Sequence, residues 1–585
     1  MARKGAQAST ADNNLPIDPE TAKKLSHTLG ITEAEVKEML AAKGGQGPPS
    51  SSRRALQSSQ PEPVQAKAPT MSAAWADFMD DDCADVDVNL GSGSKPSPSP
   101  AGNKENTTKP TAPKADPNAA YDLPIKSTLE ECQGKAGVLA QTGTLEWDIV
   151  GRSRKTNAEL GPLDICEPTI LTPEVFQGEL VAFVACAPTA CHSIAVTEKG
   201  TPFGWGRNEA SQLGHEDDVN ITTPAKLSGP WGKKKIVAAA VGKSHTILVD
   251  EDGKAYGAGR NSEGQCGINT ITEGNVTVFK PCKVGKDSKD CKFVKVSCGE
   301  NFTVAIDEQG MMYTCGNSEY GTLGNGSTGE RLVKANKISF NPSAKFVRRD
   351  QFVKRELNFK ENEEPKHLDD SHRIRISQIA CGKFHSVAIE AARPGHTSRV
   401  FSWGCGNYGS LGHKVQKDEY YPRLVETLTG PIFSSNQPVS VSCGSTCFII
   451  KTAQGHCYYS GKHKTGGEAA MTPGLLDFLA NNSHVVGPFG CGNAHVTLAT
   501  TEGQTVTYGQ GPHGELGFGV EGAKSSAAPK FIENMDGVDV VDVGCGYGHT
   551  LFVCKKGKAQ GKLGVFEGEE GEEGGGKKAK KQKTS

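Results

Sequence analysis

The sequence predicts an all-β fold, a seven-bladed β-propeller, and three observations lead to it. A short motif, clearest as CGKFH at residues 381–385, recurs seven times, with 48 to 83 residues between successive copies. Each copy opens a run of alternating apolar residues, and most runs are followed by a Gly-rich turn. Units of about fifty residues repeated in this way are typical of arrays and propellers, and four short strands per unit make one blade.

The strands are predicted from the alternating runs. The residue that opens each run is His192, His245, Phe302, His385, Cys447, His495 or His549. Runs such as HTILV at 245–249 alternate with a period of two and are rich in β-branched residues, which predicts short antiparallel strands. Turns such as FGWGRNEASQLG at 203–214 and FSWGCGNYGSLG at 401–412 separate them.

Closure of the ring is predicted from the two ends of the repeat region. The seventh run, His549 to Val553, has no Gly-rich partner, because charged and Gly residues follow it. Before the first copy, Leu145 to Arg152 resembles Phe203 to Arg207 and has no motif of its own. We therefore expect N- and C-terminal strands to share the last blade and leave no free sheet edge there.

The first 43 residues predict a short helical hairpin. Pro19 stands in the first turn of one helix, which ends at Gly30, and a capping box from Thr32 to Glu35 opens a second helix that ends near Gly44. Helices of about eleven residues are marginal alone. The segment is either a small docking module or a weakly folded hairpin.

Residues 44–143 are expected to be a disordered linker. They are dominated by Pro, Ser, Ala, Lys and Gly, and such a composition buries too little apolar surface to offset the entropy of ordering. Within the linker, Trp75, Phe78 and Met79 are spaced as one helical face beside Asp80 to Asp82. This cluster is either a segment that folds on a partner or a chance grouping.

The propeller is expected over residues 144–557, and a disordered tail over 558–585. The tail has an acidic block, Glu567 to Glu573, and then five lysines. These are Lys577, Lys578, Lys580, Lys581 and Lys583. Such a cluster is typical of a nuclear-import or polyanion-binding segment, and a merely solubilising tail is the alternative.

The composition limits the functional classes. The chain has 585 residues and a formal net charge of −2, so binding to nucleic acid or an anionic membrane would have to come from local patches. No apolar run reaches the roughly twenty residues that span a bilayer, and the start lacks the apolar core of a signal peptide. We expect no membrane insertion and no secretion.

Neither a cofactor nor covalent catalysis is expected. The 18 cysteines include no CxxC pair, and five occupy one repeat position, which predicts reduced core thiols and no zinc. GNGSTG at 324–329 matches a dinucleotide fingerprint by letters but follows a blade turn, and no P-loop motif or catalytic constellation stands out. The recurring histidine is expected to be structural, with a ring nitrogen bonded to the backbone of a neighbouring turn.

A G-x-x-H turn that enters a strand, followed by a Gly-rich turn ending in LG, resembles the regulator-of-chromosome-condensation repeat, over about Thr144 to Lys555. Trp147 to Arg152, Ser402 to His413 and Gln416 to Val425 resemble the telophase disc protein branch of that family. The resemblance implies a seven-bladed propeller that binds small Ras-like GTPases. Some members are guanine-nucleotide exchange factors, and many are associated with chromosomes or microtubules.

The resemblance also implies a partner-binding face. The exchange factor of the family presents side chains from the two positions between Gly and His of the repeat turn. Here those positions include Lys243, Ser244, Glu300, Asn301, Lys383, Phe384, Asn493 and Tyr547. The exchange factor uses acidic residues there, whereas only Glu300 is acidic in this chain. This difference argues against exchange on that factor's own GTPase.

The interval of 83 residues between Phe302 and His385 predicts an insertion over about residues 341–373. Between residues 345 and 360 it has six basic residues and only two acidic ones, Asp350 and Glu356, before it turns acidic at Glu361 to Glu364; the basic residues are Lys345, Arg348, Arg349, Lys354, Arg355 and Lys360. Long loops in compact domains are usually functional or disordered. The insertion is either a contact site for an acidic partner, such as a GTPase surface or the acidic tail of tubulin, or a blade-edge hairpin with internally paired charges.

The leading hypothesis is a monomeric, non-catalytic propeller that binds a Rac- or Ran-like GTPase and regulates it in chromosome, spindle or cytoskeletal control. Exchange activity would then act by opening the nucleotide site of the GTPase. The alternative is a chromatin- or microtubule-binding protein without exchange activity that acts through the basic loop and tail. Both hypotheses imply a location in the nucleus or on chromosomes and in the cytoplasm.

Overall fold

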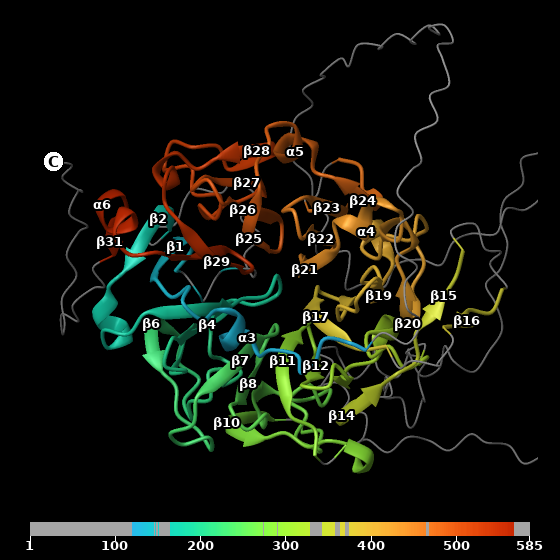
Figure 1. Cartoon of the computed structure of the whole chain (residues 1–585). Helices are drawn as coiled ribbons and strands as arrows, with labels where there is room; N and C mark the ends of the chain where they lie inside the picture. Colours follow the sequence, from blue (N-terminus) through green and yellow to red (C-terminus); the bar gives the residue numbers. More distant parts are fainter. Residues whose placement is uncertain are drawn as a thin grey trace, which may run out of the picture. The chain divides into compact units, whose positions relative to one another are not determined.

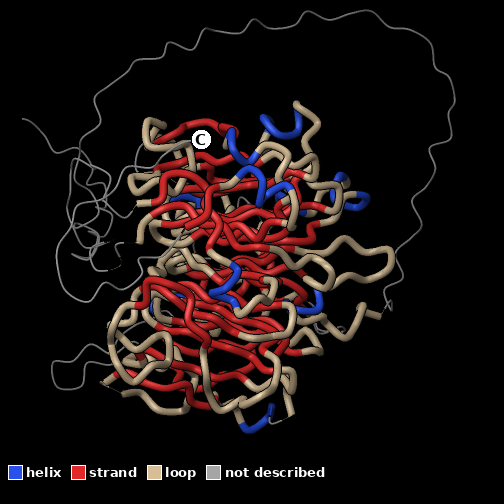
Figure 2. Tube along the Cα trace, turned by 90° about the vertical axis from the view of Figure 1, so that its left-hand side faces the viewer, coloured by secondary structure: helices blue, strands red, loops and turns tan. Residues whose placement is uncertain are grey.

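The computed structural model describes residues 120–145, 147, 150, 164–272, 274–288, 290–327, 342–356, 363–368, 374–463 and 467–566. In this part of the chain the strands form seven sheets around a common axis (Figure 1). Strands dominate the regular structure, and the helices are short (Figure 2). The prediction of an all-β, seven-bladed propeller is confirmed.

Six blades are built from strands that follow one another in the chain. Blade 1 contains β3 (Val181–Ala185), β4 (His192–Thr197), β5 (Pro202–Gly206) and β6 (Ile221–Lys226). Blade 2 contains β7 (Ile236–Val241), β8 (His245–Asp250), β9 (Ala255–Arg260) and β10 (Asn275–Pro281). Blade 3 contains β11 (Phe293–Cys298), β12 (Phe302–Asp307), β13 (Met312–Gly316) and β14 (Ser343–Arg349).

Blade 4 is the widest of these. It contains β17 (Ile376–Cys381), β18 (His385–Glu390), β19 (Val400–Gly404) and β20 (Glu419–Leu424), extended by β15 (Val353–Lys354) and β16 (Lys366–His367). Blade 5 contains β21 (Pro438–Cys443), β22 (Cys447–Thr452), β23 (Cys457–Gly461) and β24 (Ala470–Leu475). Blade 6 contains β25 (Val486–Cys491), β26 (His495–Thr500), β27 (Thr505–Gln510) and β28 (Ser525–Phe531).

Blade 7 closes the ring with strands from both ends of the described chain. Its order is β29 (Val540–Cys545), β30 (His549–Cys554), β1 (Val138–Gly143), β2 (Ile165–Leu171) and β31 (Gly564–Phe566). Closure by N- and C-terminal strands is therefore confirmed. The strand that pairs with β30 was expected within residues 145–152 and is instead β1, which lies upstream and pairs with β30 over its whole length.

The position of a glycine explains why the strand that pairs with β30 ends before residue 145. Gly143 ends β1 with a φ of 101°, as Gly206 ends β5 with a φ of 107°, and the two glycines occupy the same place in their blades. A left-handed backbone at this point favours glycine over any other residue. Trp147 follows the strand and is buried, and its carbonyl oxygen accepts two hydrogen bonds from Arg207, at 2.9 and 2.7 Å.

The hydrophobic core lies between neighbouring blades. Each of seven clusters of buried side chains joins two adjacent sheets. Between blades 1 and 2, for example, the ring of Trp231 lies 5.6 Å from that of Tyr256 and 5.2 Å from that of Phe279. The second strand of a blade is covered on both faces, so β8 is buried at every residue. This packing explains the apolar runs that follow each motif.

Short helices occupy connections in the described part of the chain. They are α3 (Thr128–Glu131), α4 (Ile432–Ser435), α5 (Asp477–Asn481) and α6 (Lys558–Lys562). The 3-10 helices are η2 (Pro173–Phe176), η3 (Lys286–Ser288), η4 (Glu319–Gly321), η5 (Asn407–Gly409), η6 (Glu426–Leu428) and η7 (Glu533–Met535). Because α6 and β31 are ordered, the expectation of a disordered tail from residue 558 is wrong up to residue 566.

Residues 120–137, which we call the strap, cross one end of the ring before β1. Asp122 N donates to Ala392 O at 2.9 Å in blade 4, and Ile125 N donates to Glu308 O at 2.9 Å in blade 3. Gly137 then bridges to Val181 of blade 1. Figure 1 shows α3 near the centre of the ring. The expectation of a disordered linker to residue 143 is therefore wrong for residues 120–143, and residues 1–119 lie outside the described chain.

An ion pair holds α3 against the inner strands. Lys295 on β11 is 5% exposed, and its Nζ lies 2.6 Å from Glu131 Oε1. Gln378 Nε2 on β17 donates to the same oxygen at 3.1 Å. A buried ammonium is costly unless it is paired, so the wall of blade 3 needs the carboxylate that the strap supplies.

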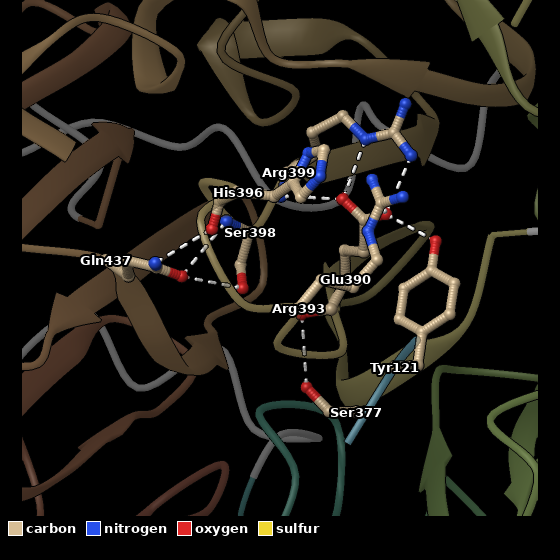
Figure 3. Close-up of polar contacts among 8 residues, drawn as sticks. All are labelled: Tyr121, Ser377, Glu390, Arg393, His396, Ser398, Arg399 and Gln437. Atoms are coloured by element: carbon tan, nitrogen blue, oxygen red, sulfur yellow. Dashed lines mark hydrogen bonds and ion pairs between the residues drawn. The ribbon is translucent and has the colours of Figure 1, made fainter. Parts of the chain in front are cut away.

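The strap begins at a polar latch on blade 4 (Figure 3). Tyr121 Oη donates to Glu390 Oε1 at 2.6 Å, and Arg399 donates to both oxygens of that carboxylate at 2.7 Å. The guanidinium carbon of Arg393 lies 4.8 Å from the centre of the Tyr121 ring. Burial, together with the charge of Glu390, raises the pKa of Tyr121 to about 12. The phenol is thus a neutral donor that fixes the start of the strap.

Candidate functional site

In each blade a short turn joins the first strand to the second and carries the recurring motif. In blades 2 to 7 a glycine stands three residues before the residue that opens the second strand. A Cβ atom at Gly242, Gly382 or Gly546 would lie 2.1 Å from the Cε1 atom of the following histidine ring. The imidazole ring thus lies directly against the glycine, and no larger side chain fits at that position. This contact is the physical reason for the G-x-x-H spacing.

Four of the histidines link neighbouring blades through a hydroxyl group. The Nε2···Oγ distances are 2.9 Å for His192 and Thr246, 3.0 Å for His245 and Thr303, 2.9 Å for His495 and Thr550, and 2.7 Å for His549 and Ser193. Each hydroxyl belongs to the residue after the motif position of the next blade. In these four links the partner of Nε2 is a side-chain hydroxyl and not the expected backbone, whereas the backbone of Cys447 in the turn of the next blade does hydrogen-bond the ring of His385.

Three consecutive junctions between blades 3 and 6 depart from this pattern. In two of them Phe302 or Cys447 replaces the histidine. In the third His385 is present, but Phe448 occupies the position in the next blade that carries the hydroxyl elsewhere. Burial lowers the pKa of His192, His245 and His495 to about 3, and that of His385 and His549 to about 4. The rings are neutral at pH 7 and almost fully buried, which suits a structural role.

The turns lie side by side at one end of the ring, which we call the turn face. Glu300 N donates to Lys383 O at 3.1 Å, Lys383 N to Ser445 O at 3.3 Å, and Tyr547 N to Ala190 O at 3.0 Å. The strap contacts residues that follow the far ends of β12 and β18, so it lies at the opposite end. The structure thus brings the eight predicted turn residues onto one face.

The acidic residue of these turns is neutralised by its neighbours. Lys243 Nζ lies 2.6 Å from Glu300 Oε1, and Lys383 Nζ lies 3.8 Å from Oε2. The side chain of Glu300 is only 8% exposed, whereas that of Lys243 is 56% exposed. The inner turns therefore present lysine charge to solvent. This arrangement differs from the acidic one that the family resemblance implied.

The remaining predicted turn residues are polar and half-buried. Asn493 Oδ1 accepts a hydrogen bond from Ser445 Oγ at 2.7 Å, and Asn301 Oδ1 accepts one from Gln265 Nε2 at 3.4 Å. Burial raises the pKa of Tyr547 to about 12, so its phenol is neutral. Ser244 lies beside Lys243 and is also half-buried. This part of the turn face offers hydrogen-bonding groups without net charge.

Sequence reasoning missed a second set of side chains on this face, in the turns between the third and fourth strands. Tyr320 lies in η4 and Tyr408 in η5. The ring of Tyr320 is 5.3 Å from that of Phe384, and Lys462 Nζ is 5.3 Å from the centre of the Tyr408 ring. An alignment of EYGTLG at 319–324 with NYGSLG at 407–412 would have revealed the shared tyrosine.

The predicted basic insertion is only partly a loop. Lys345, Arg348 and Arg349 lie on β14, the regular fourth strand of blade 3, so the expected start near residue 341 is wrong. Arg349 Nε donates to Thr314 Oγ1 at 2.6 Å, and burial lowers the pKa of Arg349 to about 10. Arg348 pairs with Asp350 at 3.2 Å. The charges on this strand are partly used within the blade.

The rest of the insertion forms a blade-edge hairpin. β15 pairs with β16 and, in parallel, with β20, so the hairpin widens blade 4. Arg355 Nε lies 4.0 Å from Glu419 Oε2, and Arg423, which is fully buried, donates to Glu419 Oε1 at 2.7 Å. Lys354 is exposed. This part of the insertion has the form of the hairpin alternative, but Arg355 pairs with Glu419 outside the insertion and Lys354 is exposed, so its charges do not all pair with one another.

The insertion and the turn face do not form one site. In the β13–β14 pair, Ser343 lies opposite Gly316 near the turn face, whereas Arg349 lies opposite Met312 at the other end. Lys360 and the lysines of the tail, Lys577, Lys578, Lys580, Lys581 and Lys583, lie outside the described residues.

Metal-ligand clusters and long apolar helices are absent from the described residues. No group of three or more His, Cys, Asp or Glu side chains is placed to hold a metal ion there. Nor is any helix in the described ranges long and apolar enough to cross a membrane. The 17 cysteines of these residues are free thiols.

Comparison with known proteins relates the chain to one family. A family model described as the RCC1-like domain matches residues 150–552. The Protein RCC2 homolog of Danio rerio is 31% identical over 468 residues, which cover 78% of this chain and 89% of that relative. Protein RCC2 of Homo sapiens is 29% identical over 435 residues, which cover 74% of this chain and 78% of that relative.

A solved structure supports the fold independently. The crystal structure of Prp20p from Saccharomyces cerevisiae, reported with its binding properties to Gsp1p and histones, matches with a TM-score of 0.54. The sequence identity is 18%, and the match covers 75% of this chain and 97% of that one. At this identity the likeness concerns the fold alone.

Proposed function

Because this chain belongs to the RCC1-like propeller family, we propose that it is a non-catalytic scaffold that binds and regulates a small Ras-superfamily GTPase of the Rac or Ran type. The proposed binding surface is the turn face, with Lys243, Glu300, Lys383 and Phe384 among its contact residues. Control of chromosomes, the spindle or the cytoskeleton is the proposed setting, in the nucleus and the cytoplasm.

One observation carries this proposal. The side chains that the family presents from its repeat turns converge here on one end of the ring, while the strap crosses the other end. Half-buried aromatic and polar groups surrounded by lysines are suited to a protein partner, because interface centres are enriched in aromatic residues and complementary charges steer association. A structural relative, Prp20p, is reported with its binding properties to Gsp1p, which supports the partner class.

The charge pattern suggests what the scaffold does to its partner. An exchange factor must bind the nucleotide-free GTPase more tightly than the loaded forms, since a ligand shifts an equilibrium only by its differential affinity. The family exchange factor uses acidic turn residues, whereas the one acid here, Glu300, is paired with lysines. We therefore propose that this scaffold binds a loaded form and acts as an effector or a sequestering regulator.

The test is capture of GTPases in three nucleotide states. Rac- and Ran-type GTPases that are nucleotide-free, GDP-loaded or loaded with a GTP analogue are passed over the immobilised full chain. We expect retention of a loaded form and weaker retention of the empty form. Lys243→Glu should reduce the association rate about tenfold, because it reverses an exposed charge on the binding face. The matched control is Lys233→Glu, an exposed lysine in the connection between blades 1 and 2.

Each other outcome decides against part of this proposal. Preferential retention of the nucleotide-free GTPase would make the protein an exchange factor. Equal effects of Lys243→Glu and Lys233→Glu would remove the turn face as the binding surface. Lack of retention in all three states would reject a Rac- or Ran-type partner.

A second candidate function is binding to chromatin or microtubules without any GTPase. A structural relative is reported with binding to histones, and the sequence ends in a lysine-rich segment. Full-length chain and a variant lacking residues 577–585 are compared for co-sedimentation with nucleosomes and with microtubules. Loss of binding in the truncated variant supports this candidate, whereas unchanged binding contradicts a role for the tail.

A further inference from the structure

One sector of the turn face gathers aromatic rings and lysines. It consists of Tyr320, Lys383, Phe384, Tyr408 and Lys462, all half-buried, which we call the aromatic–lysine sector. Lys383 Nζ lies 5.1 Å from the centre of the Phe384 ring, and Lys462 Nζ lies 5.3 Å from that of Tyr408. Cys405 N donates a hydrogen bond of 2.8 Å to Phe384 O, so the turn that carries Phe384 lies next to the segment that leads to Tyr408.

The two tyrosines are held in an unfavourable backbone conformation. Tyr320 has a φ of 58° and Tyr408 a φ of 55°, in the left-handed region that bulky residues rarely adopt. Glu263, which also precedes the glycine of its turn in blade 2, is not in that region. Strained residues of this kind cluster at ligand-binding sites, where the surrounding structure holds them in place. Ser211 in the corresponding turn of blade 1 and Asn269 after that of blade 2 also have a positive φ, of 55° and 68°, so this sector is distinguished by the bulky aromatic residues held in that conformation.

Charge distinguishes the outer loop of blade 4 from the outer loop of blade 1. The corresponding loop of blade 1 exposes Glu216, Asp217 and Asp218, whereas the loop of blade 4 exposes Lys414 beside the sector lysines. Because like charges repel and opposite charges attract, an acidic partner segment would be directed away from blade 1 and toward blades 4 and 5.

Two of the acidic groups near the sector are engaged within the protein, whereas Glu319 beside Tyr320 is half-buried and Glu468 in the loop of blade 5 is exposed. Glu300 pairs with Lys243 at 2.6 Å, and Asp418 Oδ1 accepts a hydrogen bond from Gly406 N at 2.9 Å. Val415, in the same loop as Asp418, is 37% exposed and adds apolar surface. The sector therefore offers cations held over aromatic rings, with an apolar side chain beside them.

The chemistry of the sector favours a protein segment over a nucleic acid. Bases bind single-stranded nucleic-acid platforms by stacking on open ring faces. Here Lys383 and Tyr320 lie against the Phe384 ring, and Lys462 lies over the Tyr408 ring. A lysine over a ring can still attract carboxylates, as Lys383 does with Glu300 Oε2 at 3.8 Å, and half-buried rings can receive apolar side chains.

We propose that the aromatic–lysine sector is a docking site for an acidic protein segment that carries apolar side chains. The carboxylates pair with Lys383 and Lys462, and an apolar side chain packs against Tyr320, Phe384 and Tyr408. The inference rests on the proposed use of the turn face as a docking surface, and it assigns the chemistry of the partner to one sector of that face.

The test uses the full chain and a short fluorescein-labelled peptide of glutamates with two phenylalanines, followed by fluorescence anisotropy. We expect binding that weakens as salt is added. The double variant Lys383→Ala/Lys462→Ala and the double variant Tyr320→Ala/Tyr408→Ala should each weaken it about tenfold or more. Lys254→Ala/Lys292→Ala, which removes two exposed lysines at the opposite end of the ring, is the matched control and should leave the affinity unchanged.

Several results would overturn the inference. These are equal affinity for a peptide in which lysines replace the glutamates, equal affinity for a peptide of glutamates alone, and equal losses in the sector variants and the control. Binding of a labelled oligothymidylate that is lost in the sector variants, with no peptide binding, would assign the sector to nucleic acid instead. The assay contains no GTPase, so its outcome is independent of the capture experiment, and either can fail alone.

Discussion

At the scale of single residues, the recurring motif is explained by contacts that the sequence does not display. The glycine is required because the imidazole lies against it, and the imidazole is required because it reaches a hydroxyl of the next blade. The sequence predicted a structural histidine correctly, because an ionised buried imidazole would be costly. It could not identify the partner, because the hydroxyl lies more than fifty residues away.

The histidine–hydroxyl links should contribute to stability. Ser193→Ala removes the hydroxyl that lies 2.7 Å from His549 Nε2 and leaves a buried ring nitrogen without its partner. We expect a loss of about 1 to 3 kcal/mol in the free energy of unfolding. The measurement is the shift in the thermal or urea midpoint of the purified protein.

Ser386→Ala is the matched control for that substitution. Ser386 occupies the same position in blade 4, and its Oγ lies 3.4 Å from Cys381 Sγ, as Ser193 Oγ lies 3.5 Å from Cys186 Sγ. The residue that would reach Ser386 is Phe302, which has no polar group. Equal losses in the two variants would show that the imidazole contact adds nothing.

A buried carboxyl group is a second informative residue. Glu515 stands where Gln212 and Gln265 stand in blades 1 and 2, and its Oε2 accepts a hydrogen bond from His513 N at 2.7 Å. Burial raises the pKa of Glu515 from 4.5 to about 7. In its protonated form the side chain resembles the glutamine found in the other turns.

This resemblance predicts a pH-dependent effect of Glu515→Gln. A group whose pKa is raised by folding contributes stability below its unfolded pKa, and this contribution is lost as pH rises through the folded pKa. The window here runs from about pH 4.5 to 7. We expect Glu515→Gln to be nearly neutral at pH 5 and to stabilise the protein by roughly 3 kcal/mol at pH 8, measured as midpoints of thermal unfolding. A constant difference at both pH values would contradict the raised pKa.

At the scale of elements, strand boundaries were less predictable than strand existence. The alternating runs predicted the second strand of every blade, because stacking between sheets imposes that pattern. The front strand was placed within residues 145–152, on the similarity around Trp147, whereas β1 ends at Gly143. The basic residues of β14 were predicted to lie in a loop, because an outer strand rich in charged residues lacks the apolar alternation by which strands are recognised.

The position of β1 predicts how truncated chains behave. A chain of residues 144–566 lacks β1, which lies between β30 and β2, so β30 and β2 lose their shared neighbour and the blade is open. A chain of residues 120–566 keeps both β1 and the strap. We expect the shorter chain to be aggregated or to melt at a clearly lower temperature, because unpaired strand edges promote association. Size-exclusion chromatography and circular dichroism provide the measurement.

The result that would contradict this prediction is a monomeric 144–566 chain with the melting temperature of 120–566. A chain of residues 138–566, which retains β1 without the strap, separates the two contributions. It should be folded and less stable than 120–566, because Lys295 then loses the carboxylate of Glu131.

At the scale of the whole propeller, the two ends of the ring differ in what they can offer a partner. The strap, with its latch at Tyr121 and its ion pair at Glu131, crosses one end. The turn face at the other end combines lysines with aromatic rings, and the basic residues of β14 and β15 lie on the outer strands. We therefore expect a protein partner to dock on the turn face.

The sequence by itself determined the repeat, the all-β class, the number of blades and the sharing of the last blade between both ends. These properties follow from local patterns, since strand alternation and turn glycines are read within a few residues. Only the tertiary structure decided which hydroxyl meets each histidine, that Glu300 is paired with two lysines, that residues 120–137 form a strap, and that two tyrosines join Phe384. These contacts join residues far apart in the chain, and their geometry depends on how neighbouring blades pack, which no local pattern records.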